Sequence, residues 1–283
     1  MTDKVQLHLD ENGTATLLLN RPEVHNAFDP DMVDQLIAAL EDLRASSDVR
    51  AVVLMGAGES FCAGADIGHM KASARYTRQQ NVAQAERSAR MFHALYTLDK
   101  PTVACVRGAV RGGGCGLVAA CDIAIASRFA TFRLSEVKLG IIPAMISPYV
   151  VAAIGQRMAR RYMLSGEEID SAEAYRIGLV HDIVEEDDLL PRVSAVLAHL
   201  YTSGPRAIAA VKSLITAVAH APIDEALIAE TSRRIADIRA TPEGQEGLAA
   251  FLEKRKPSWV EPPSRPARKP AARKKTAAKP RKR

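Results

Sequence analysis

The sequence lacks the residue patterns that mark several common kinds of site and location. Among its 283 residues are four cysteines, none spaced as C-x-x-C, and seven histidines without an H-x-x-x-H pair, so we expect no metal site. No apolar run approaches the roughly 18 residues that cross a membrane, and no signal peptide is recognised. These absences favour a cytoplasmic protein whose thiols stay reduced.

Two glycine-rich turns are the most informative feature that is present. Residues 62–66 (CAGAD) and 111–116 (RGGGCG) follow apolar runs at residues 51–55 and 102–106, which are typical of buried strands, and each turn leads into a helix-like segment. Glycine lets a backbone approach a ligand closely, and free N–H groups at a helix start carry partial positive charge. Brought together, two such turns can stabilise one developing oxyanion; separately, each would only serve a tight turn.

Other functions of glycine-rich turns need residues that are missing here. A phosphate-binding P-loop ends in Gly-Lys-Ser/Thr, and neither turn does. A dinucleotide-binding turn reads G-x-G-x-x-G, whereas residues 112–117 (GGGCGL) break the last position, although Glu136 stands where that motif has its ribose-binding acid. No G-x-S-x-G nucleophile elbow occurs. The turns therefore favour neither nucleotide binding nor serine-hydrolase chemistry.

Five motifs follow one another along the chain: residues 20–28 (NRPEVHNAF), 61–67 (FCAGADI), 112–114 (GGG) with 121–123 (CDI), Glu136 with 140–143 (GIIP), and 250–256 (AFLEKRK). In this order they resemble the crotonase family, also called the enoyl-CoA hydratase/isomerase family, over about residues 5–259. The resemblance implies an α/β fold in which repeated ββα units form a spiral, followed by C-terminal helices through which members form trimers or dimers of trimers. It implies an acyl-CoA substrate, and no cofactor besides the coenzyme A that the substrate carries.

The resemblance also implies which residues form the site. The backbone N–H groups of Ala65 and Gly113 would bind the thioester oxygen, where negative charge develops, and each such donor is typically worth about 3 to 4 kcal/mol of barrier. Glu136 would act as the catalytic acid or base. Further contacts to the acyl group or to coenzyme A are implied at Val24, Ala27, Ala63, Ala65, Asp66, Ile67, Arg111, Gly113, Phe251 and Lys254.

Several of these assignments have a structural alternative. Glu136 can pair with a base such as Lys138 instead of serving catalysis. Arg111 can hold a second carboxylate on the substrate, or it can point to solvent. Phe251 and Lys254 in the family help to cover the adenine and phosphates of coenzyme A, often from a neighbouring subunit, but they also fit an ordinary amphipathic helix.

Gly116 departs from the family pattern. Hydratases of the family usually have a glutamate at this position, which shares the activation of water with a second glutamate, here Glu136. A single base suits an isomerase, since it removes a proton at one carbon and returns it two carbons along. Family geometry implies that position 116 faces Glu136, so we expect Gly116→Glu to raise hydration of a simple enoyl-CoA.

Closer similarity favours a hydratase. Residues 116–122 (GLVAACD) and 134–148 (LSEVKLGIIPAMISP) are similar to bacterial methylglutaconyl-CoA hydratase-like members of branched-chain and leucine degradation, which also tend to lack the first glutamate. We therefore rank hydration of a short or branched acyl-CoA, with 3-methylglutaconyl-CoA as a candidate, ahead of isomerisation. A catalytically silent fold with a polyanion-binding tail is the alternative from another class.

The chain divides into three stretches. Residues 1–185 alternate strand and helix signals, residues 186–259 are helical in pattern, and residues 260–283 are rich in proline, alanine and lysine. From residue 264 to the end there are ten lysines or arginines and no acid, so the net charge of +5 leaves −5 for the rest. This stretch cannot bury enough apolar surface to fold alone. We expect a disordered basic tail that contacts nucleic acid or other polyanions weakly, or that only aids solubility.

Overall fold

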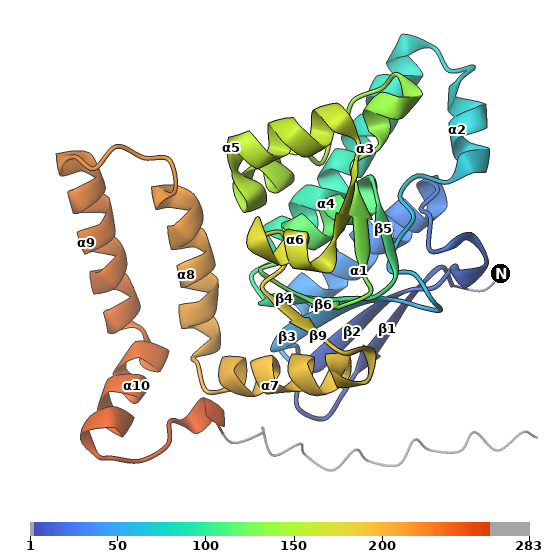
Figure 1. The fold of residues 1–283 in the computed structure, drawn as a ribbon. Helices are drawn as coiled ribbons and strands as arrows, with labels where there is room; N and C mark the ends of the chain where they lie inside the picture. The colour runs from blue at the N-terminus through green and yellow to red at the C-terminus, as the bar shows by residue number, and fades with distance from the viewer. Residues whose placement is uncertain (1–2, 261–283) are drawn as a thin grey trace, which may run out of the picture.

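Two β-sheets and the helices between them form the body of the protein (Figure 1). The computed structural model describes residues 3–260, so the predicted basic tail lies outside the described residues and stays a prediction. The larger sheet has the order β1-β2-β3-β4-β6-β9, and the smaller has the order β5-β7-β8. The strands are β1 (Val5–Leu9), β2 (Thr14–Leu19), β3 (Ala51–Gly56), β4 (Thr102–Val106), β5 (Ala109–Arg111), β6 (Ile123–Ser127), β7 (Thr131–Arg133), β8 (Glu168–Asp170) and β9 (Asp182–Val184).

From β4 to β7, consecutive strands alternate between the two sheets. β4 and β6 pair in parallel in the larger sheet, while β5 and β7, which directly follow them in the chain, pair in parallel in the smaller one. The same arrangement begins after β3, where Cys62 forms an isolated parallel bridge with Val110 of β5. Each pair of strands leads into a helix, so the predicted α/β fold of repeated ββα units is confirmed.

Helices cover both faces of the larger sheet. Along β3 and β4 the side chains alternate between two clusters, and apart from Thr102 both strands lack polar side chains because both of their faces are buried. Leu54 and Val106 pack in the main core, beneath α1, α3, α4 and α5. Val53 and Val103 pack on the other face, against α7. The body helices are α1 (Pro30–Ala45), α2 (Ile67–Ser73), α3 (Arg78–Tyr96), α4 (Gly113–Ala120), α5 (Ser147–Ser165), α6 (Ser171–Arg176) and α7 (Leu189–Tyr201).

The starts of α1 and α2 follow from their first residues. Pro30 stands at the first helical position, where a missing N–H costs nothing, and the carboxylate of Asp29 accepts a hydrogen bond from the N–H of Met32 at 2.9 Å. Asp66 caps α2 in the same way, by accepting from the N–H of His69 at 3.0 Å. Both helices therefore begin at an aspartate that follows an extended segment.

The last three helices form an arm beside the body (Figure 1). They are α8 (Pro205–Val218), α9 (Glu225–Ala240) and α10 (Pro242–Leu252). Neither α8 nor α9 has a fully buried residue, whereas α7, from the same predicted helical stretch, packs on the larger sheet. None of the helices within residues 3–260 is long and apolar enough to cross a bilayer.

Candidate active site

A cavity of about 200 Å³ lies where the two glycine-rich turns meet. Both turns contribute to its wall, together with the segment around Glu136 and apolar side chains from α2, α3 and the loop before α5. The lining residues are Phe28, Ala63, Gly64, Ala65, Met70, Phe92, Arg111, Gly112, Gly113, Ser135, Glu136, Leu139, Ile141, Ile142, Pro143, Met145 and Ile146.

The first turn presents the N–H of Ala65. Phe28 runs parallel to this turn: its N–H donates to the oxygen of Gly64 at 2.8 Å, and its oxygen accepts from the N–H of Asp66 at 3.1 Å. These two bonds fix the peptides on either side of Ala65, whose own N–H has no acceptor among the described residues. Gly64 has φ +84°, and a Cβ there would stand 2.7 Å from the oxygen of Arg111. Only glycine allows the two turns to approach this closely.

The second turn presents the N–H of Gly113, the first residue of α4. This N–H belongs to the first turn of a helix, where it has no partner within the helix and carries partial positive charge. A Cβ at Gly113 would overlap Cζ of Phe28, and a Cβ at Gly64 would lie 3.5 Å from the nitrogen of Gly113. The turns are thus in contact, and two free N–H groups line one cavity, as the residue pattern predicts.

Glu136 brings a carboxyl group to the same place. It opens a short 3₁₀ helix (Glu136–Leu139), and its Oε1 would be 3.0 Å from a Cβ at Gly112. Its Oε2 is buried and has no hydrogen-bond partner among the described residues. Burial raises the pKa of Glu136, and a hydrogen bond from its own backbone opposes that rise only in part. A carboxyl group with a raised pKa, beside two free N–H groups, is suited to exchanging protons with a bound molecule.

Lys138 does not pair with Glu136. Lys138 is exposed, and no ion pair joins the two side chains within residues 3–260. The structural alternative, in which Glu136 serves only to balance a neighbouring base, is therefore not supported. Glu136 is also the one carboxylate among the described residues that line the cavity.

The space beside Gly116 is filled, which corrects the expectation for this position. A Cβ at Gly116 would overlap Cγ2 of Ile146 and would lie 2.7 Å from its Cβ and 3.0 Å from Cε1 of Phe92. Ile146 and Phe92 line the cavity, whereas Gly116 does not. A glutamate introduced at this position would meet these two side chains before it could reach Glu136. A gain of hydration from Gly116→Glu alone is therefore no longer expected.

Arg111 turns its guanidinium group toward the smaller sheet. Nη1 donates to the oxygen of Thr131 at 2.7 Å, and Nη2 donates to Oγ1 of Thr131 and to Oε2 of Glu168, each at 2.9 Å. The side chain is 27% exposed, so it does not simply point to solvent. Its donors are engaged within the protein, and the prediction that it holds a substrate carboxylate gains no support from these contacts.

The other predicted contact residues lie at different distances from the cavity. Ala63 lines it, whereas Asp66 stands just beyond Ala65 as the cap of α2. Ile67 is 67% exposed, and Val24 and Ala27 belong to the segment that precedes Phe28. Their roles stay predictions.

Phe251 lies in the last turn of α10 and Lys254 lies two residues after its end, and neither lines the cavity. Phe251 is 81% exposed. Their role in covering coenzyme A also stays a prediction.

Several residues of the cavity were not singled out as contacts from the sequence. Phe28, Ile141 and Ile142 belong to the quoted motifs, yet only the fold brings them to the glycine turns. Phe92 and Met70 come from helices whose sequence pattern does not reveal which residues reach the site. No local feature of the sequence predicts these contacts, because the distance of a residue from the cavity depends on where its helix packs in the folded protein.

Thiol and metal chemistry have little support at this site. Burial raises the pKa of Cys62 and of Cys115 to about 12, so both thiols stay protonated near neutral pH. Among residues 3–260, no three His, Cys, Asp or Glu side chains come together in a way that would hold a metal ion. Glu136 and the backbone N–H groups of Ala65 and Gly113 are the remaining candidates for chemistry in the cavity.

Comparisons with known proteins agree with this geometry. The sequence profile of the enoyl-CoA hydratase/isomerase family matches residues 10–262. A short-chain-enoyl-CoA hydratase of Clostridium acetobutylicum is 33% identical over 252 residues, which cover 87% of this chain and 94% of that protein. A crotonyl-CoA hydratase of Syntrophomonas wolfei is 32% identical over 252 residues, which cover 88% and 95%. The crystal structure of an enoyl-CoA hydratase from Shewanella pealeana has a TM-score of 0.88 and 42% identity, and the match covers 90% of this chain and 96% of that one.

Proposed function

Because the chain belongs to the enoyl-CoA hydratase/isomerase family and has the crotonase fold, we propose that it hydrates a short or branched 2-enoyl-CoA in the cavity between the glycine-rich turns. The observation that carries this proposal is the juxtaposition of Glu136 with the free N–H groups of Ala65 and Gly113. The hydratase names of the relatives favour hydration as the overall reaction.

In the proposed mechanism, the N–H groups of Ala65 and Gly113 donate hydrogen bonds to the thioester oxygen. Glu136 accepts a proton from water as the water oxygen bonds to carbon 3, and the electrons of the double bond move toward the thioester oxygen. The carboxyl group of Glu136 then returns the proton to carbon 2, which restores the carbonyl group. The two donors stabilise the enolate between these steps, and they gain strength as charge develops.

Isomerisation is the second candidate, and the filled space beside Gly116 favours it. Ile146 and Phe92 occupy the region that a side chain at position 116 would enter, and the cavity contains one carboxylate. Glu136 alone suffices to remove a proton from carbon 2 of a 3-enoyl-CoA and to deliver it to carbon 4. The same two N–H groups would stabilise the same kind of enolate.

The lining also bears on the acyl group. Apolar side chains such as Met70, Ile141 and Met145 surround the cavity, which suits a short or branched hydrocarbon chain. 3-Methylglutaconyl-CoA remains a candidate because of the sequence similarity. Its second carboxylate would need a cationic partner, and the guanidinium of Arg111 is already bound by Thr131 and Glu168.

An absorbance screen distinguishes these possibilities. Hydration removes the conjugated double bond of crotonyl-CoA or 3-methylglutaconyl-CoA and lowers its absorbance, whereas isomerisation of a 3-enoyl-CoA creates conjugation and raises it. We expect hydration to be the faster reaction for at least one branched 2-enoyl-CoA. Isomerisation without hydration would select the second candidate. No turnover of any enoyl-CoA would favour a catalytically silent protein.

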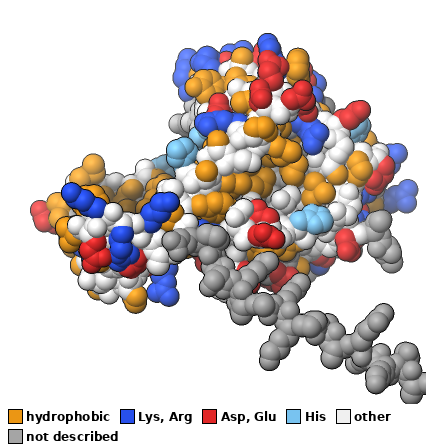
Figure 2. All heavy atoms as spheres, turned by 90° about the horizontal axis from the view of Figure 1, so that it is seen from below, with side chains coloured by type: hydrophobic (Ala, Val, Ile, Leu, Met, Phe, Trp, Pro, Cys, Tyr) orange, Lys and Arg blue, Asp and Glu red, His pale blue; other side chains and the backbone are white. Residues whose placement is uncertain are grey.

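The arm supports the further proposal that the chain forms homotrimers. Apolar side chains exposed along it are those of Val211, Ile215, Ile228, Ile235, Leu248, Phe251 and Leu252. Figure 2 shows apolar side chains among charged ones on the surface of the arm, seen from below. Hollows of about 460 and 420 Å³ lie where α8 meets the body. Second copies of the chain would bury this surface. Light scattering of the purified protein is expected to give three times the mass of the chain or a multiple of it.

A further inference from the structure

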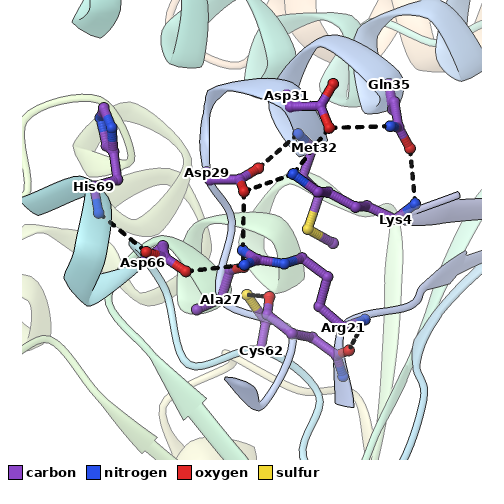
Figure 3. Close-up of polar contacts among 11 residues, drawn as sticks. Lys4, Arg21, Ala27, Asp29, Asp31, Met32, Gln35, Cys62, Asp66 and His69 are labelled. Carbon is purple, nitrogen blue, oxygen red and sulfur yellow. Dashed lines mark hydrogen bonds and ion pairs between the residues drawn. The ribbon is translucent and has the colours of Figure 1, made fainter. Parts of the chain in front are cut away.

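Five charged side chains, those of Lys4, Arg21, Asp29, Asp31 and Asp66, lie together beside the first glycine-rich turn (Figure 3). Arg21 is 14% exposed, and its Nη2 is 3.1 Å from Oδ2 of Asp66, while its Nη1 is 3.4 Å from Oδ2 of Asp29. Lys4 binds the same oxygen of Asp29 at 2.7 Å. None of these residues lines the cavity, so this cluster does not belong to the binding surface itself.

Asp29 and Asp66 each bind Arg21 and also cap a helix. Oδ1 of Asp29 accepts from the N–H of Met32, and Oδ1 of Asp66 accepts from the N–H of His69, so one oxygen of each carboxylate caps a helix. The second oxygen of each faces Arg21. The guanidinium group therefore ties the start of α1 to the start of α2.

The same guanidinium group also holds the chain just before α1. Nη1 of Arg21 donates to the oxygen of Ala27 at 2.6 Å, one residue before Phe28. Phe28 is the residue whose N–H and oxygen bond on either side of Ala65. Its ring also lies directly against Gly113, since a Cβ there would overlap Cζ and would be 3.1 Å from Cε2. Phe28 thus touches both turns, and Arg21 fixes the backbone before and after it.

We propose that Arg21 is a positioning residue that aligns the N–H groups of Ala65 and Gly113 through Phe28. It does so by holding Ala27, Asp29 and Asp66, the residues on either side of the Phe28–Ala65 bridge. The proposal rests on the proposed function, in which these N–H groups bind the thioester oxygen. It goes beyond that function because it assigns a role in catalysis to a side chain outside the cavity.

An arginine is required by the geometry of these contacts. The planar guanidinium group directs several N–H donors at fixed angles, and here they reach two carboxylates and one carbonyl oxygen. A lysine keeps the charge but has a single nitrogen to offer. Burial alone would raise the pKa of Asp66, yet the N–H of His69 and the guanidinium of Arg21 hold it below its usual range. Asp66 therefore stays ionised and bound to Arg21 at neutral pH.

The test compares Arg21→Lys and Asp66→Asn with a matched control, Arg44→Lys. Arg44 donates to the oxygens of Thr97 and Ala94 at the far end of α1, so its replacement removes similar contacts remote from the cavity. Misplaced catalytic groups typically cost up to about 10²-fold in rate. We expect kcat to fall by about tenfold to hundredfold in both test variants, with a smaller change in KM, because the donors act most strongly on the developing charge.

Infrared difference spectroscopy of bound butanoyl-CoA, labelled with carbon-13 at its thioester carbonyl, supplies a readout that reduced stability would not move. Hydrogen bonds from Ala65 and Gly113 should lower the carbonyl stretching frequency in the unaltered protein, and the shift should shrink in both test variants but not in Arg44→Lys. If Arg21→Lys does not fold, Asp66→Asn tests the positioning role by itself. Its amide oxygen can still cap α2, whereas its ion pair with Arg21 is lost.

The possible failures are distinguishable. An unaltered protein that hydrates or isomerises an enoyl-CoA, combined with test variants that keep the full carbonyl shift and the kcat of Arg44→Lys, would overturn the positioning role and leave the proposed function intact. An unaltered protein that shows no shift of the bound carbonyl would instead refute the proposed role of the two N–H groups, and the positioning role with it.

Discussion

Glu136→Gln is expected to lower kcat by about 10²- to 10⁴-fold, the usual range for the loss of a general acid or base. Glu136 is the one carboxylate that lines the cavity in the described part of the chain, so no neighbouring acid can replace it. Glutamine has the same shape and cannot exchange the proton. Steady-state turnover of the substrate found in the absorbance screen measures the effect, and binding of coenzyme A thioesters should remain.

The stability of this variant provides an independent check. Oε2 of Glu136 is buried without a partner among the described residues, so a charged carboxylate at this position destabilises the folded protein. A neutral amide removes this destabilisation. The melting temperature of Glu136→Gln should therefore equal or exceed that of the unaltered protein. Glu167→Gln, in which an exposed carboxylate is replaced, serves as the control and should keep its kcat. A Glu136→Gln variant that turns over at the original rate would mean that another group is the base.

The pH dependence of kcat should reveal the same group. Burial raises the pKa of Glu136, so the base form appears only above the usual range for a glutamate, and activity should rise through that pKa as pH increases. This rise should disappear from the residual activity of Glu136→Gln.

Gly116→Glu is expected to destabilise the fold by at least about 3 kcal/mol, because it overpacks the core and buries a carboxyl group among apolar side chains. A Cβ at this position already overlaps Cγ2 of Ile146 and approaches Phe92, and Gly116 and Ile146 are both buried. Chemical denaturation measures the loss, and turnover by the remaining folded protein should fall.

A second substitution separates the two causes. Ile146→Ala alone should cost about 2 to 5 kcal/mol through the cavity it leaves. In the double variant, Ile146→Ala provides space beside the cavity for the glutamate at position 116. The double variant should therefore lose less free energy of unfolding than the two single variants lose together. It should also hydrate crotonyl-CoA better than Ile146→Ala does. Simple additivity, with no gain of hydration, would show that position 116 cannot supply a carboxylate to the site.

The residues of the two turns were enough to predict the centre of the site. Gly64 and Gly113 occupy positions where a Cβ would collide with the neighbouring turn or with Phe28, and such close approaches leave a glycine-rich pattern in the sequence. Glu136, a carboxylate in a stretch otherwise poor in charge, was assigned its role through the resemblance to the crotonase family. These signals are local: each depends on a residue type that its own backbone or its own surroundings require.

The helix starts and buried strands were predictable for the same reason. Asp29 and Pro30 at the start of α1, and the apolar run of β3, reflect hydrogen bonding and burial within a few residues of the chain. Hence the α/β class and the order of its units follow from the sequence.

Only the tertiary structure decided how the remaining side chains meet. That Ile146 fills the space beside Gly116, that Arg111 binds Thr131 and Glu168, and that Arg21 joins Asp29 to Asp66 are contacts between residues far apart in the sequence. The residue type at such a position is compatible with several partners, and packing selects one of them. The sequence by itself therefore determined the fold class and indicated the glycine-rich turns and Glu136 as the centre of the candidate site, whereas the space and charges around them depended on how the units pack.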